Sequence, residues 1–430
     1  MYPQIKDIPP NKLLTSLHRH DLLPAIVFVP TRRRCDEAAT EVSLDRSQPT
    51  DDARTALRKE MFDTYAAENP EVVGHKHTKA LISSGVASHH AGHIPAWKLL
   101  VEKMMSDGLL RAIFATSTVA AGVDFPARTV VIGNADTRGN DGWRSLTASE
   151  LQQMTGRAGR RGRDKVGFVV LVPGQFQDPR KIAELLRSKP DALQSKFRAT
   201  YTSLLNLLDA FSSFEQVREI TEKSFAFREF RKRGNRRDDE SLSDLGERIW
   251  APFERRAHVL DELGYIDINA ETVTDDGKWL ADLRVDRPLL IGEALRQGVF
   301  DELSVAEFAG MIAALAADPE RSYGELRISR KLDNAISALE ATIVRVSNIE
   351  WKNRVEINED LNFSAAAAAE RWAAGMEWND LVARTRAEEG DLVRLLSRTG
   401  EALRQIADLK HHVSPVADTA FQVMVREPIR

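Results

Sequence analysis

Four short apolar runs, separated by helical segments, limit most strongly what the first part of this chain can fold into. The runs are rich in β-branched residues and continuously apolar, and they span residues 25–29, 111–115, 129–132 and 167–172. Runs of this length and composition suit strands that are buried on both faces, and helical patterns such as 97–106 lie between them. The alternation predicts a parallel sheet with helices on both faces, at whose carboxyl edge ligands bind.

From about residue 178 the strand pattern gives way to long segments of helical periodicity. A helix that stops at Gly264 is followed by two short strand-like runs at 265–268 and 271–274, which is the order of a winged helix. The remainder of the chain reads as helical throughout. We therefore expect an α/β lobe at 1–178, a winged-helix domain at 179–285 and an all-α helical bundle at 286–430.

The composition excludes several classes of protein. The net charge of the 430 residues is -4, so contacts with nucleic acid must come from local basic patches. A single cysteine, Cys35, excludes an internal disulfide and a cysteine-based metal site. No apolar run reaches the roughly 20 residues of a membrane span, and the first residues lack the pattern of a signal peptide. We expect a cytoplasmic protein with no membrane partner.

The stretch Gln153 to Gly162, QMTGRAGRRG, predicts a clamp for a phosphate group. Arg157 and Arg160 lie between glycines after a short predicted helix, and the guanidinium fork suits phosphate oxygens. The stretch resembles motif VI of superfamily 2 helicases. This resemblance implies that Arg157 and Arg160 are catalytic fingers on the γ-phosphate of ATP, with Gln153 in the same ATP-binding set. The alternative is a surface turn with ordinary basic residues.

Residues 115–126, ATSTVAAGVDFP, follow a predicted buried strand and resemble helicase motif V. The hydroxyls of Thr116 and Thr118 suit phosphate or ribose groups of a nucleic acid. Gly122 allows close approach of a backbone to the nucleotide, and Asp124 can accept a hydrogen bond from a hydroxyl or order water near a metal. The alternative is a strand-to-helix turn capped by threonine.

The stretch Phe28 to Arg34 resembles motif IV of the same helicases. Its strand would deliver Thr31, Arg32 and Arg33 to the carboxyl edge of the sheet, where they suit contacts with the phosphates of a nucleic acid. A solvated basic start of a helix fits the same residues, and the sequence leaves both interpretations open.

Five of the ten histidines lie between residues 75 and 93, namely His75, His77, His89, His90 and His93. No carboxylate or cysteine accompanies them at zinc spacing, so we expect no metal site. The stretch Gly85 to Gly92 resembles the paired-histidine segment of the superkiller-type branch of superfamily 2. The resemblance implies that His89 and His90 contact nucleic acid.

These segments, in this order, resemble the second RecA-like lobe of superkiller-type (Ski2-like, exosome-associated) DExH-box RNA helicases. Residues 294–315 and 387–409 resemble the C-terminal helical domain of the same family. The resemblance implies the C-terminal part of an ATP-dependent helicase that unwinds or remodels RNA in the 3′-to-5′ direction. It implies ATP and Mg²⁺ as cofactors and single-stranded RNA as a partner.

The chain departs from the family in two ways. It has no GxxxxGK[ST] phosphate loop, and its DExx strings at 36–39 and 238–241 do not end an apolar strand. We therefore expect a first RecA-like lobe, which would bind most of the ATP and Mg²⁺, to be supplied in cis or in trans, and this chain alone to be inactive. The stretch 231–250 is too short for the family's arch insertion.

A helix expected at 391–409 would lie along the path of the strand. Its apolar residues Leu392, Leu395, Leu396, Leu403 and Ile406 fit a core face. Arg394 and Arg398 project from an adjacent face, either toward nucleic acid or simply toward solvent. We expect Trp372 and Trp378 to be core residues rather than stacking platforms.

Two other functions remain open on the sequence. The chain can be a non-catalytic protein that binds single-stranded nucleic acid or regulates a partner. It can also belong to a DNA repair helicase of the same superfamily, because the 2′-hydroxyl contacts that separate RNA from DNA leave no readable pattern here.

Overall fold

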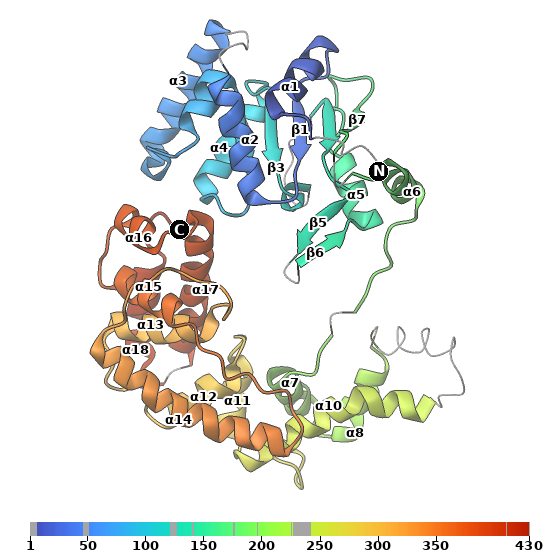
Figure 1. Ribbon diagram of the computed structural model, residues 1–430. Helices are drawn as coiled ribbons and strands as arrows, with labels where there is room; N and C mark the ends of the chain where they lie inside the picture. The colour runs from blue at the N-terminus through green and yellow to red at the C-terminus, as the bar shows by residue number, and fades with distance from the viewer. Residues whose placement is uncertain are drawn as a thin grey trace, which may run out of the picture. The chain divides into compact units, whose positions relative to one another are not determined.

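The computed structural model describes residues 7–45, 51–120, 127–139, 142–174, 177–195, 197–224, 226, 242–409 and 411–429. The chain forms two compact units, one of residues 1–192 with 389–391 and one of residues 193–388 with 392–430 (Figure 1). The three-domain division expected from the sequence stays a prediction. Among the described residues, no helix is both long and apolar enough to cross a membrane.

The first unit is built on a five-stranded parallel sheet, as predicted. Its strands are β1 (Ala25–Phe28), β2 (Val86–His89), β3 (Ala112–Ala115), β4 (Thr129–Ile132) and β7 (Phe168–Leu171), in the order β2-β3-β1-β4-β7. Four of them coincide with the predicted apolar runs. β2 was not predicted as a strand because Ser88 and His89 interrupt its apolar character, although all four of its residues are buried.

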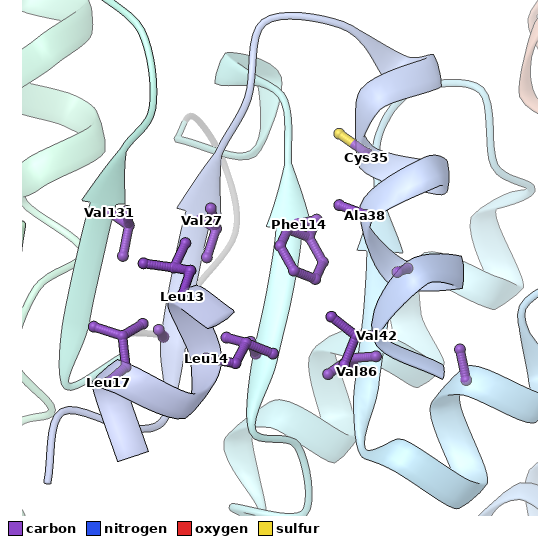
Figure 2. Packing of buried hydrophobic residues seen from close by; sticks show 14 of the residues in the cluster. Leu13, Leu14, Leu17, Val27, Cys35, Ala38, Val42, Val86, Phe114 and Val131 are labelled. Atoms are coloured by element: carbon purple, nitrogen blue, oxygen red, sulfur yellow. The ribbon is translucent and has the colours of Figure 1, made fainter. Parts of the chain in front are cut away.

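The helices of the first unit are α1 (Pro10–Arg19), α2 (Arg32–Leu44), α3 (Asp52–Glu68), α4 (Pro95–Ser106), α5 (Ala148–Thr155) and α6 (Pro179–Arg187). Short helical turns lie at η1 (Pro70–Val72), η2 (Ala80–Ser84) and η3 (Ser117–Ala120). The apolar faces of α1 and α2 pack on the sheet, with Leu14 and Val42 in one cluster with Phe114 (Figure 2). A separate hairpin joins β5 (Asp136–Gly139) to β6 (Gly142–Ser145).

The second unit is helical, as the sequence predicts for the C-terminal region. Its helices are α7 (Tyr201–Phe211), α8 (Phe214–Glu222), α10 (Leu242–Glu262), α11 (Asp275–Asp282), α12 (Pro288–Arg296), α13 (Val305–Ala316), α14 (Arg330–Lys352), α15 (Phe363–Ala373), α16 (Trp378–Thr385), α17 (Glu389–Asp408) and α18 (Ser414–Met424). A two-stranded hairpin of β8 (Ile266–Asp267) and β9 (Thr272–Val273) lies between α10 and α11. The two expected short strands are therefore present, whereas a winged helix stays a prediction.

Small residues bring α13 and α15 close together. The alanines at 365–369 are completely buried, and a Cβ added at Gly310 would lie 3.0 Å from the carbonyl oxygen of Ala366. Trp372 and Trp378 are buried, which confirms the prediction that both are core residues. The apolar face predicted for α17 is also buried, including Leu392 and Ile406.

Candidate functional site

The two predicted phosphate-binding arginines lie on a turn that is fixed to the sheet. α5 begins with a capping box, in which Thr147 and Glu150 each accept the other's backbone N–H, and it ends at Thr155. Ala127 then donates to the carbonyl of Arg157 at 3.0 Å and accepts from the N–H of Gly159 at 2.7 Å. Ala127 lies two residues before β4, so the turn lies at the amino end of this strand.

Two glycines make this arrangement possible. Gly159 adopts a φ of +91°, a conformation that other residues rarely take. A Cβ at Gly167 would lie 2.4 Å from the carbonyl carbon of Ala158, so only glycine lets the two backbone segments meet there. The glycines of QMTGRAGRRG and of the strand that follows thus hold the turn in shape.

Arg160 is held by Asp164. The Nε and Nη2 groups of Arg160 donate to the two carboxylate oxygens of Asp164 at 2.8 and 3.0 Å. The backbone N–H of Arg160 donates to the same carboxylate at 2.9 Å. The Asp164 side chain is only 1% exposed, and the guanidinium of Arg160 lowers its pKa to about 2. Asp164 is therefore a carboxylate at neutral pH.

The rest of the predicted ATP-binding set is only partly visible. Gln153 is exposed on α5, one turn before the arginines, and Arg157 is half-buried on the turn. Gly122 and Asp124 fall outside the described residues. The turn and the predicted motif V segment nevertheless meet at Ala127, because this residue follows the segment and pairs with the turn. The contact of these residues with a nucleotide stays a prediction.

The predicted motif IV and motif V hydroxyls lie at the carboxyl ends of neighbouring strands. Thr31 follows β1, and its hydroxyl caps α2 by accepting the N–H of Arg34 at 3.3 Å. Thr116 and Thr118 follow β3, and their hydroxyls lie 2.9 Å apart. Because β1 and β3 are hydrogen-bonded neighbours, the structure brings the two segments to one edge of the sheet.

The basic residues of the motif IV segment have different surroundings. Arg33 is 86% exposed and pairs with Glu37 at 3.0 Å, while Arg32 is half-buried. A role of Thr31, Arg32 and Arg33 in nucleic-acid binding stays a prediction.

A cavity of about 610 Å³ opens beside this edge. Thr31 and Arg33 line it together with Arg138 and Trp143 of the β5–β6 hairpin. Arg138 and Trp143 lie opposite each other in the hairpin, which places them on one face, and Trp143 is 59% exposed. We did not predict these two residues from the sequence. The turn letters GNDG between two short runs were the signal that could have found the hairpin.

The clustered histidines surround one carboxylate that the sequence did not associate with them. Asp36 comes from α2, and its Oδ1 lies 2.8 Å from Nε2 of His77, 3.0 Å from that of His90 and 3.5 Å from that of His93. The Nζ of Lys76 lies 2.6 Å from the other carboxylate oxygen. We call this group, Asp36 with His75, His77, His90 and His93, the Asp36 hub.

Two backbone N–H groups determine the tautomers of the Asp36 hub. Gly92 donates to Nδ1 of His90 at 3.1 Å, and the backbone of His77 donates to Nδ1 of His75 at 3.3 Å. The proton of each neutral ring is therefore on Nε2. His75 then donates to Nδ1 of His93 at 3.3 Å, which leaves the Nε2 proton of His93 for Ser88, at 2.7 Å, and for Asp36.

The ionisation of the Asp36 hub agrees with these tautomers. Burial lowers the pKa of His75 to about 2 and that of His93 to about 3, so both rings are neutral. Burial alone would raise the pKa of Asp36, but hydrogen bonds from His77, His90 and His93 hold it well below its usual range. The hub is thus one carboxylate that accepts hydrogen bonds from the Nε2 atoms of several buried histidines.

This geometry bears on two predictions. Asp36, His90 and His93 lie close enough together to share a cation, which the sequence did not suggest. In the structure the ring nitrogens of His90 and His93 take part in hydrogen bonds, and the expectation of no metal site stays a prediction. His89 and His90 are 4% and 1% exposed, and His89 lies 2.8 Å from Glu102. Their burial opposes the prediction that these side chains contact nucleic acid.

The two arginines expected along the strand path are exposed on α17, as predicted from the core face. Arg398 forms an ion pair with Asp286. In the described part of the chain, Arg394 has no ion pair. Their contact with nucleic acid stays a prediction.

Comparisons with known proteins identify one matching domain family and several similar proteins. Residues 270–429 match the DSHCT (NUC185) domain family. The chain is 36% identical over 247 residues to Superkiller complex protein 2 of Mus musculus. This match covers 56% of this chain and 19% of that protein. It is 34% identical over 224 residues to the probable helicase HelY of Mycobacterium tuberculosis, covering 51% of this chain and 25% of that protein.

A third relative is the exosome RNA helicase MTR4 of Homo sapiens, which is 34% identical over 202 residues, covering 46% of this chain and 19% of that protein. The chain therefore spans a quarter or less of the length of these relatives.

Proposed function

We propose, from the relationship of this chain to the C-terminal region of Ski2-like superfamily 2 helicases, that it is the C-terminal part of an ATP-dependent helicase. The helicase would unwind or remodel RNA in the 3′-to-5′ direction. The observation that carries the proposal is the turn with Arg157 and Arg160, which is fixed to Ala127 at the end of the motif V segment. Such preorganised guanidinium groups stabilise the charge that develops on phosphate during hydrolysis.

In this proposal, residues 1–178 form the second RecA-like lobe, 179–285 a winged-helix domain and 286–430 a helical domain. ATP and Mg²⁺ bind mainly to a first RecA-like lobe, which is supplied in cis or in trans. The protein works in the cytoplasm.

The single strand would pass the carboxyl edge of the sheet near Thr31 and Thr116. The exposed ring of Trp143 offers a stacking surface, and Arg138 beside it offers a phosphate contact. On α17, Arg394 would contact the phosphates directly. Because His89 and His90 are buried, their side chains would not touch the strand.

ATP hydrolysis tests the proposal. This chain alone is expected to show no ATPase activity that nucleic acid stimulates, whereas the chain joined to a first RecA-like lobe is expected to show it with single-stranded RNA. Arg160→Ala should then lower kcat by about 10³-fold, the scale of an arginine finger. Arg161→Ala, an exposed arginine of the same turn, is the matched control and should change kcat little. Stimulated turnover by this chain alone that Arg160→Ala abolishes would contradict the division between two lobes.

Binding of single strands separates the proposal from its alternatives. The chain should bind single-stranded RNA weakly, with an affinity that falls as salt rises. No binding at low salt, or binding that salt does not affect, would count against the strand path. Stimulation by DNA but not by RNA would indicate a DNA repair helicase. Strand binding without ATPase activity, even with a first lobe present, would indicate a binding or regulatory protein.

A further inference from the structure

We propose that Asp164 is a positioning residue, which holds Arg160 so that the outer N–H groups of its guanidinium face the nucleotide. This inference rests on the proposed function, because it concerns how one of the two fingers is aimed. The function itself assigns no role to Asp164.

Three donors of Arg160 converge on this carboxylate. The side chain uses Nε and Nη2, and the backbone N–H reaches the same oxygen as Nε, at 2.9 and 2.8 Å respectively. The N–H of Asp164 returns to the carbonyl of Arg160 at 2.9 Å, which closes the turn. Both the backbone and the side chain of Arg160 are therefore held at one end of the turn, with little freedom to swing.

The bidentate contact leaves donors at the tip of Arg160. A guanidinium has five N–H groups, and Asp164 occupies the edge formed by Nε and Nη2. Both protons of Nη1 and the second proton of Nη2 have no partner among the described residues. These protons form a second fork at the end of the side chain, which matches the spacing of phosphate oxygens.

Arg160 and Asp164 differ in how far their side chains are exposed to a ligand. The side chain of Arg160 is 21% exposed, while that of Asp164 is 1% exposed. A ligand can therefore reach the end of Arg160 but not the carboxylate behind it. Because the acid is shielded and the guanidinium is not, the negative charge of Asp164 does not confront the phosphates directly.

A second arginine connects Asp164 to the sheet. Nη1 of Arg128 lies 3.4 Å from the other oxygen of Asp164, and Nη2 lies 3.0 Å from Asp21. Arg128 directly follows Ala127, the residue that pairs with the turn. The finger, its carboxylate and the start of β4 thus form one rigid support, which lowers the cost of orienting the guanidinium during the reaction.

A double-mutant cycle tests the inference in the helicase that combines this chain with a first RecA-like lobe. Asp164→Asn should lower kcat about 10-fold while changing the KM for ATP less than about threefold, since the loss is one of orientation in the transition state. In the Arg160→Ala background, Asp164→Asn should have no further effect on kcat. An unchanged kcat in Asp164→Asn, or the same 10-fold loss in the Arg160→Ala background, would overturn the inference.

Two further measurements keep this test decisive. Asp164→Glu keeps the negative charge but moves it by one methylene, so it should also lower kcat. It replaces Asp164→Asn in the test if the asparagine variant folds poorly. In this chain alone, the Arg160 Nε–H resonance should exchange slowly with water and should exchange much faster in Asp164→Glu; equal exchange rates would overturn the inference. A wild-type enzyme without stimulated ATPase would instead overturn the proposed function, and this inference with it.

Discussion

Asp36 and Asp164 are two carboxylates of the same unit that gather basic side chains in different ways. Asp36 accepts from Nε2 of His77 and of His90, and Nδ1 of His90 already accepts the N–H of Gly92. Asp164 accepts from Arg160, whose guanidinium keeps protons to spare. The difference indicates which of the two can be a site: saturated donors at Asp36 hold the fold together, whereas unsatisfied donors at Arg160 are available to a ligand.

Removing each carboxylate gives the largest expected effect. Asp36→Ala leaves several buried N–H groups without an acceptor, and it should lower the free energy of unfolding of the first unit by about 3–4 kcal/mol. Asp164→Ala should cost less, about 1–2 kcal/mol, because Arg160 can turn to water. Hydrogen exchange of the amides in β1 and β3 measures both values without assuming that the two units unfold together.

Glu37→Ala is the matched control for this comparison. Glu37 lies next to Asp36 on α2 and pairs with Arg33, but both are exposed, so its loss should cost less than about 0.5 kcal/mol. If Asp36→Ala and Asp164→Ala lowered the free energy of unfolding equally, the distinction between the two carboxylates would be contradicted. That distinction is that the donors around Asp36 are all in use, whereas Arg160 has donors left.

Acid should weaken the Asp36 hub at a higher pH than it weakens the turn at Arg160. The pKa values of His75 and His93 are about 2 and 3 in the folded chain and ordinarily 6.5, so below pH 6.5 the unfolded chain binds more protons. Stability should fall by about 4 kcal/mol from pH 7 to pH 5, roughly 2 kcal/mol from each ring.

The pKa of Asp164 is about 2 against an ordinary 3.8, so its contribution is present above pH 3.8 and is lost only below it. The same hydrogen-exchange measurement, repeated between pH 7 and pH 5, checks this order. The double variant His75→Asn with His93→Gln should remove the pH dependence of stability between pH 7 and pH 5, and Asp164→Asn should not. The opposite result would contradict the assignment of this pH dependence to the two histidines.

The two exposed arginines of α17 extend the comparison to the second unit. Arg398 already pairs with Asp286, whereas Arg394 has no ion pair within the described ranges. Arg394→Gln should weaken binding of single-stranded RNA about threefold to fivefold and reduce the salt slope by about 0.7, as expected for one lost phosphate contact. Arg398→Gln should have a smaller effect. Titrations at several salt concentrations measure both; a larger effect at Arg398 would reverse the expected ranking.

The smallest expected effect is that of added zinc. If the ring nitrogens of the Asp36 hub are committed to hydrogen bonds, the purified chain should contain no stoichiometric metal, and micromolar Zn²⁺ should not stabilise the first unit. Metal analysis and thermal unfolding with and without Zn²⁺ check this. One bound zinc per chain, lost in His90→Gln, would show that the hub exchanges its protons for a metal.

Local patterns predicted much of this fold. The strands β1, β3, β4 and β7 follow from short, β-branched apolar runs, because such runs can be buried only as strands between helices. The short helix predicted before the two arginines is α5, and its start is set locally by the capping box of Thr147 and Glu150, which lie three residues apart. The core face of α17 was predicted from helical periodicity, because it depends only on the spacing of apolar residues along one helix.

Long-range contacts explain what the sequence did not reveal. Asp36 meets the histidines only because α2 packs beside β2, which no spacing in the chain predicts. His89 of β2 likewise meets Glu102 of α4 through the packing of two separate elements. By contrast, Asp164 lies only four residues after Arg160, so the spacing in the sequence could have suggested this pair. The bidentate geometry of the pair could not be predicted, because it requires the turn that Gly159 and Gly167 allow.

The most direct test of the account is Arg160→Lys in the helicase assembled from this chain and a first RecA-like lobe. Lysine keeps the positive charge but lacks the second fork, so it cannot hold Asp164 and a phosphate at once. We predict that kcat of the RNA-stimulated ATPase falls about 100-fold, while the first unit loses less than about 1 kcal/mol of stability. A lysine variant that keeps the wild-type kcat would contradict the claim that the free donors of Arg160 act on the nucleotide.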